Sequence, residues 1–96
     1  MARGEMLTVF TYDVSADRRR RRVARLLVEA ATRVQLSVFE ARLTRHRAEA
    51  LAQRVAAELG PGDSLRVYVM AADGEARSRV YGDGAPIEAD ADFWLF

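Results

Sequence analysis

An aspartate and a run of arginines near the amino terminus are the residues best suited to chemistry in this sequence. Asp13 directly follows the apolar segment Met6–Tyr12, and the run Arg18–Arg22 begins a few residues later. A carboxylate is an oxygen ligand of the kind that Mg²⁺ or Mn²⁺ takes, together with water and substrate phosphates. Arginine holds a phosphate through the paired N–H donors of its guanidinium. Together they predict a catalytic, metal-binding Asp13 beside a basic surface that contacts nucleic acid.

Each of these interpretations has a structural alternative. Asp13 could simply cap the loop before the arginines, and one such carboxylate per chain is a poor metal site unless two copies meet across a dimer axis. The arginine run could be a solvated helix face. Cations near a helix amino terminus are unfavourable by about 0.3–1 kcal/mol each, however, which indicates another task, such as receiving an anion. The arginines expected to contact nucleic acid are Arg18, Arg19, Arg20, Arg22, Arg25 and Arg33.

The composition excludes several other kinds of site. The sequence has no cysteine and one histidine, His46. Disulfide scaffolds, thiolate zinc sites, cysteine nucleophiles and imidazole clusters within one chain are therefore excluded. No apolar run reaches the roughly 20 residues of a membrane span, and Met1–Met6 lacks the apolar core of a signal peptide. We expect a cytoplasmic protein without membrane contact.

The two halves of the chain carry opposite charge. All basic residues are arginine, and residues 1–48 hold eleven of them against five acidic residues, whereas residues 49–96 hold four against nine. The first half could therefore face a polyanion although the net charge is only +1.

The hydrophobic pattern predicts the elements that position these residues. Met6–Tyr12 is rich in β-branched and aromatic residues, which predicts a strand buried on both faces. From Arg18 to about Ala31 apolar residues recur at intervals of three and four, as in an amphipathic helix. Ser15 or Asp17 is expected to cap that helix.

The middle of the chain predicts two strands and a second helix. Arg33–Leu43 contains two alternating apolar sets that are out of phase. One flat strand cannot hold both on one face, so we predict two short strands with a bend or reversal near Ser37–Phe39. A helix capped by Thr44 is expected from about Arg45 to Leu59.

The last third of the sequence predicts further strands. Ser64–Ala71 alternates like a strand, and Asp73-Gly74 is a hairpin signal leading into Arg77–Tyr81. The chain ends on four apolar residues, 93–96, which we expect to add to the sheet of a second protomer or, alternatively, to pack within their own chain.

This element order is the βαββαβ pattern of a ferredoxin-like sandwich, an α+β fold, with an extra C-terminal strand. We expect a single domain over residues 1–96, with a core at about 6–72 and a C-terminal hairpin and dimerising strand at about 73–96, the strand being exchanged in a homodimer. The aromatic residues expected in the core or an interface are Tyr12, Phe39, Tyr68 and Tyr81.

Two blocks of residues resemble a known family. They are Tyr12-Asp13-Val14-Ser15 with Asp17, Arg20 and Arg22-Val23, and Arg33-Val34-Gln35 with Ser37-Val38-Phe39-Glu40; Leu65-Arg66-Val67-Tyr68 adds to them. They are similar to the small CRISPR-associated protein of spacer acquisition, the second of the two universal adaptation proteins, also described as an endoribonuclease. The resemblance spans about Leu7 to Tyr68. It departs at Leu36, where many members have tyrosine, and at residues 30–32, where a glycine often precedes the second block.

The resemblance implies a symmetric homodimer whose C-terminal strands extend the partner's sheet. Asp13 would bind Mg²⁺ or Mn²⁺ together with the partner's Asp13 and hydrolyse phosphodiester bonds in RNA or duplex DNA, with Tyr12, Ser15 and Phe39 in support. The family also bridges dimers of the CRISPR integrase while holding DNA. The alternatives are therefore a metal-dependent endonuclease, a non-catalytic scaffold that binds duplex DNA between integrase dimers, and an RNA-cleaving toxin of the same fold.

Overall fold

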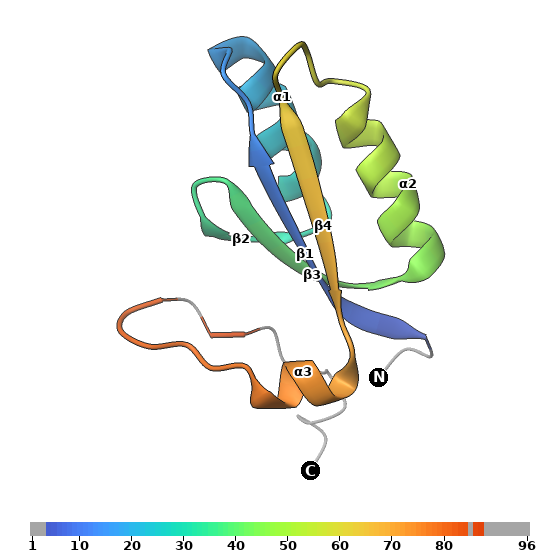
Figure 1. The fold of residues 1–96 in the computed structure, drawn as a ribbon, viewed down its shortest axis with the longest axis vertical. Helices are drawn as coiled ribbons and strands as arrows, with labels where there is room; N and C mark the ends of the chain where they lie inside the picture. Colours follow the sequence, from blue (N-terminus) through green and yellow to red (C-terminus); the bar gives the residue numbers. More distant parts are fainter. Residues whose placement is uncertain (1–3, 85, 88–96) are drawn as a thin grey trace.

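The computed structural model describes residues 4–84, 86 and 87 of the 96-residue chain. The elements follow one another as β1 (Glu5–Asp13), α1 (Asp17–Val28), β2 (Thr32–Gln35), β3 (Val38–Thr44), α2 (Arg45–Ala56), β4 (Ser64–Met70) and α3 (Ala72–Arg77) (Figure 1). In these residues, no helix is long and apolar enough to cross a membrane.

The four strands form one antiparallel sheet in the order β2-β3-β1-β4. β1 lies at the centre because its side chains are apolar on both faces, and it pairs with β3 and β4 along most of its length. Phe10 stands opposite Phe39 on β3 and Val67 on β4. The predicted ferredoxin-like βαββαβ core is confirmed.

Both long helices pack on the same face of the sheet (Figure 1). Alternation along β1 directs Phe10 and Tyr12 to that face, whereas Asp13 lies on the opposite face. Val23 and Leu27 of α1 and the apolar side chains of α2 are buried against these aromatic rings. The helices are thus held by one apolar stripe each, which leaves the arginines of α1 outside the core.

The two out-of-phase apolar sets of residues 33–43 belong to separate strands, as predicted. The chain reverses at Leu36-Ser37 between β2 and β3, and the register of the pair shifts between Arg33 and Gln35. Thr44 caps α2 as expected, since its hydroxyl accepts a hydrogen bond of 3.2 Å from the Arg47 N–H.

The helix limits differ from those expected. The N-cap of α1 is Ala16, without a side-chain cap, so the prediction that Ser15 or Asp17 caps this helix is wrong. α1 ends at Val28 rather than near Ala31, and α2 ends at Ala56 rather than Leu59, because turns follow in which the chain folds back on the last helical carbonyls.

The hairpin predicted at Asp73-Gly74 is also wrong, because these residues lie inside α3 and the following segment 78–81 is not a strand. Asp73 and Glu75 lie in the first turn of α3, where acidic groups favour the helix dipole. Glu75 also forms a largely buried ion pair with Arg42 of β3, and this tertiary contact favours the helix over the local turn signal. The expected C-terminal strand lies outside the described residues.

Candidate functional site

Asp13 is the last residue of β1 and is exposed on the face of the sheet opposite α1 and α2. Its partner in register is Ser64, the first residue of β4. The Asp13 carboxylate makes no hydrogen bond or ion pair with any residue that the structure describes, although several arginines follow it closely. It does not cap the loop before α1, so it is available to a ligand.

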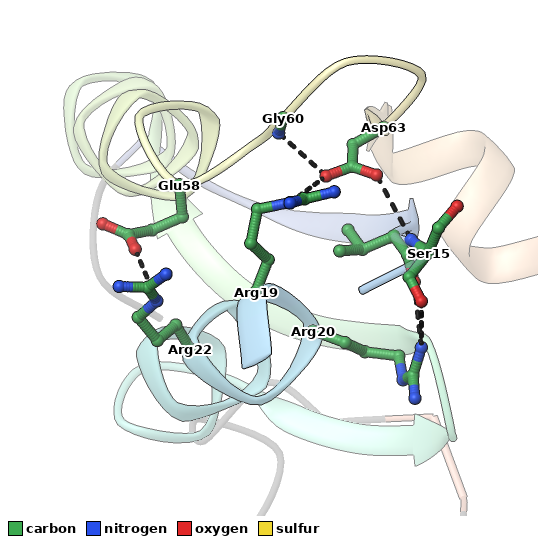
Figure 2. A network of polar contacts seen from close by, with 8 residues as sticks. Ser15, Arg19, Arg20, Arg22, Glu58, Gly60 and Asp63 are labelled. Carbon is green, nitrogen blue, oxygen red and sulfur yellow. Dashed lines mark hydrogen bonds and ion pairs between the residues drawn. The ribbon is translucent and has the colours of Figure 1, made fainter. Parts of the chain in front are cut away.

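A carboxylate that sequence reasoning missed, Asp63, holds the loop between Asp13 and α1. Figure 2 shows Asp63 next to Arg19, Gly60 and Ser15. The Asp63 Oδ2 accepts from Arg19 Nε at 2.7 Å and from the Gly60 N–H at 2.8 Å, and its Oδ1 accepts from the Ser15 N–H at 3.2 Å. Because Ser64 pairs with Asp13, the neighbouring Asp63 lies beside the loop that leaves β1. The Asp63 contacts therefore fix how the chain leaves Asp13 and enters α1.

Hydrogen bonding determines the charge state of Asp63. The Arg19 side chain, and next the Gly60 N–H, lower the pKa of the Asp63 carboxyl from 3.8 to about 2, and they outweigh the opposing effect of desolvation. The Asp63 side chain is inaccessible to solvent. A Cβ at Gly60 would lie 2.6 Å from Cζ of Arg19, so a larger residue there would force the Arg19 side chain to move.

The arginine run is divided between paired and unpaired side chains. Arg19 pairs with Asp63, Arg22 with Glu58 at 3.2 Å, and Arg20 with Asp17. Arg20 also donates to the carbonyls of Val14 and Ser15, each at 3.1 Å (Figure 2). Within the described residues, the arginines of α1 without a hydrogen bond or ion pair are Arg18, Arg21 and Arg25.

These three arginines are spaced by three and four residues, so they lie along one exposed side of α1. We call Arg18, Arg21 and Arg25 the α1 arginine stripe. Arg21 was absent from the residues predicted to contact nucleic acid. The helical spacing of the run is a sequence signal that could have found it, whereas the acidic partners of Arg19 and Arg22 come from distant parts of the chain.

The predicted supporting residues Tyr12 and Phe39 lie in the core and brace the β2–β3 turn. Their rings stack with centroids 6.3 Å apart, and the Arg33 guanidinium lies over the Phe39 ring at 5.3 Å. The Tyr12 hydroxyl donates to the Leu36 carbonyl at 3.2 Å, and Arg33 donates to the same oxygen from Nε and a terminal nitrogen at 3.0 and 2.7 Å. Tyr68 and Tyr81, expected in the core or an interface, are 49% and 88% exposed in this chain.

The predicted residues thus form two neighbourhoods. Ser15 lies in the loop next to Asp13, Arg20 donates to its carbonyl, and Ser15 and Arg19 both donate to Asp63. Arg20, Arg25 and Arg33 line a groove between α1 and the β2–β3 turn, and Asp13 is not among its lining residues. His46 is exposed in the first turn of α2, apart from both.

Residues 6–77 match the family described as CRISPR associated protein Cas2. The chain is 34% identical over 92 residues to a CRISPR-associated endoribonuclease Cas2 of Chloroflexus aurantiacus, a match that covers 94% of this chain and 99% of the relative. Among solved structures, a hypothetical protein from Thermus thermophilus has a TM-score of 0.77 at 38% identity, covering 88% of this chain and 100% of the other. A chain of a partial Cas6-RT-Cas1–Cas2 complex has a TM-score of 0.73 at 27% identity, covering 90% and 95%.

Proposed function

Because this chain belongs to the CRISPR-associated Cas2 family, we propose that it is a metal-dependent endonuclease or endoribonuclease of CRISPR adaptation, built around the Asp13 carboxylates of a homodimer. The observation that carries the proposal is the exposed Asp13 carboxylate at the end of β1, unpaired within the described residues despite its arginine-rich surroundings. An arginine partner at Asp13 would have neutralised the charge that a cation needs.

The donor set at Asp13 fits Mg²⁺ or Mn²⁺ only when two protomers contribute. The residues that the structure describes contain no cluster of three or more histidine, cysteine or acidic side chains suited to a metal ion. One carboxylate from each protomer, completed by water and substrate phosphate, is a set that Mg²⁺ accepts. When bound, such a cation polarises the scissile phosphate and activates a water molecule. The protein's own part is to hold Asp13 at the end of β1 through the Asp63 contacts and to bind the strand through arginines.

The edge of the sheet supports the homodimer. Among the described residues β4 is an edge strand, and its Val67 and Val69 are 36% and 57% exposed, although they lie on the helix face. Beside them, a mostly apolar groove of about 390 Å³ extends to α2. An edge of this kind accepts an added strand, and the apolar residues 93–96 of a second copy are the segment we assign to it.

A second candidate function is a non-catalytic scaffold that binds duplex DNA and the CRISPR integrase. Two observations favour it: the likeness to a chain of a complex that contains both Cas1 and Cas2, and the unpaired arginines along α1. Backbone contacts from arginine bind duplex DNA without regard to sequence. The partner in this function is Cas1. One dimer could serve both functions.

Cleavage of matched RNA and duplex DNA by wild type and Asp13→Asn, with Mg²⁺, Mn²⁺ or EDTA, tests the enzyme. Asp83→Asn is the matched control, because it removes an exposed carboxylate from the turn that follows α3. We expect EDTA-sensitive cleavage that is lost in Asp13→Asn, retained in Asp83→Asn, and accompanied by an unchanged dimer in size-exclusion chromatography.

Cleavage that survives in Asp13→Asn would contradict a catalytic role of this carboxylate. If wild type binds duplex DNA and Cas1 but cleaves neither nucleic acid, the scaffold is the function. In that case Asp13→Asn should leave binding of DNA and Cas1 unchanged.

A further inference from the structure

A groove of about 460 Å³ runs between the outer side of α1 and the β2–β3 turn. Its walls carry Arg21 and Arg25, and its apolar part consists of Ala24, Val28 and Leu36. Leu36 is 83% exposed and Val28 57% exposed. Exposed aliphatic side chains flanked by unpaired arginines are typical of a surface that binds a ligand.

The turn that presents Leu36 is held in place by a single acceptor. The Leu36 carbonyl accepts from Tyr12 and twice from Arg33, and Arg33 in turn packs on Phe39 in the core. The guanidinium of Arg33 is thereby occupied with its own turn. The Leu36 side chain is held outward, preorganised for contact, and this reduces the entropy lost when a ligand binds.

The charge of the groove is available to an anion. Arg21 and Arg25 have no acidic partner among the described residues, whereas Arg20, which also lines the groove, is paired with Asp17. Arg18 continues the α1 arginine stripe beyond the lining residues of the groove. A ligand that fits must therefore present negative charge next to an apolar surface.

We propose that this groove binds one unpaired nucleotide of a nucleic-acid strand, with its base against Leu36 and Val28 and its flanking phosphates on Arg21 and Arg25. The inference rests on the proposed function, to which it adds a preference for nucleic-acid substrates with an unstacked base. A regular duplex presents phosphates but keeps its bases stacked inside, so it would leave Leu36 and Val28 without a partner. An unpaired nucleotide supplies both the anion and the flat apolar surface.

The volume of the groove agrees with this occupant. About 460 Å³ lies within the range of about 300–1,000 Å³ of small-molecule sites. The aliphatic side chain of Leu36, exposed in the groove, offers a base an apolar surface. The exposed aliphatic area explains why the site would prefer a base to a bare phosphate.

Fluorescence anisotropy with two labelled probes tests the proposal: a blunt DNA duplex, and the same duplex with one bulged thymidine. A third probe replaces the bulged thymidine with an abasic residue and thus keeps its phosphate. The variants are Leu36→Ser and the pair Arg21→Gln with Arg25→Gln. Val80→Ser is the matched control, since it removes another exposed aliphatic side chain, 44% exposed, from the segment after α3.

We expect wild type and Val80→Ser to bind the bulged probe about fivefold to tenfold more tightly than the blunt or abasic probe. Leu36→Ser should lose that preference without a change in its affinity for the blunt duplex. The double arginine variant should bind all three probes more weakly. Because these side chains are exposed, each variant should retain the melting temperature of wild type.

Equal affinity of wild type for the three probes, or a Leu36→Ser variant that keeps the preference, would overturn the inference and leave the proposed function intact. Failure of wild type to bind any of the three DNA probes would instead contradict the DNA-binding part of the proposed function and, with it, the role of the groove. An Asp13→Asn variant that keeps the preference for the bulged probe would show that the groove acts independently of the metal site.

Discussion

The α1 arginine stripe makes a quantitative prediction for the salt dependence of duplex DNA binding. Three unpaired arginines per protomer place six positive charges on a dimer. If each neutralises one phosphate, the slope of log K against log salt is about −5.4, and affinity falls about 2,000-fold between about 50 and about 200 mM salt. Arg21→Gln removes two of these contacts per dimer. The slope should then be about −3.6, and the affinity should fall only about 150-fold over the same range.

Titrations of a labelled blunt duplex by anisotropy at several salt concentrations measure this slope. Arg54→Gln is the matched control, because it removes the same charge from an exposed position on α2. It should weaken binding slightly through net charge and leave the slope of log K against log salt at about −5.4. An Arg21→Gln slope equal to that of wild type, or an Arg54→Gln slope that falls as far, would refute the assignment of the stripe to phosphate contacts.

Two further predictions concern the Asp63 contacts. Gly60→Ala should lower the urea midpoint of unfolding, because the new Cβ displaces Arg19 from Asp63. The matched control is Gly74→Ala inside α3, where a new Cβ meets no atom within 4 Å. That variant should instead raise the free energy of unfolding by about 0.5–1 kcal/mol. A Gly60→Ala variant as stable as wild type in urea would contradict the packing of Arg19 described above. The second prediction concerns pH. Since folding lowers the pKa of Asp63 from 3.8 to about 2, the contribution of the ionised carboxylate to the free energy of unfolding is complete above about pH 4 and is lost as the pH falls toward 2. The difference in urea midpoint between wild type and Asp63→Asn should therefore narrow over that interval, and a difference that stays constant down to pH 2 would argue against the low pKa.

Patterns over a few neighbouring residues were enough to predict most of the fold. The apolar run of β1, the phase change within residues 33–43 and the Thr44 cap are each local features of the sequence, and the structure contains all three. The Asp73-Gly74 signal failed because a local turn preference of this kind is weak beside a largely buried contact between Arg42 and Glu75, 33 residues apart in the chain.

The composition of the candidate site was determined in part by the amino-acid sequence, since Asp13 after a strand and arginines on a helix are visible in the printed chain. Which arginines remain available could not be read in the same way. Asp63 lies 44 residues from Arg19 and meets it only because β4 pairs with β1, and Glu58 reaches Arg22 only because the two helices share one face of the sheet. Charge pairing acts over a few ångströms in space, whereas residue type and helical spacing are local properties of the chain. The sequence therefore specified the charges, and the folded structure selected those left for a ligand.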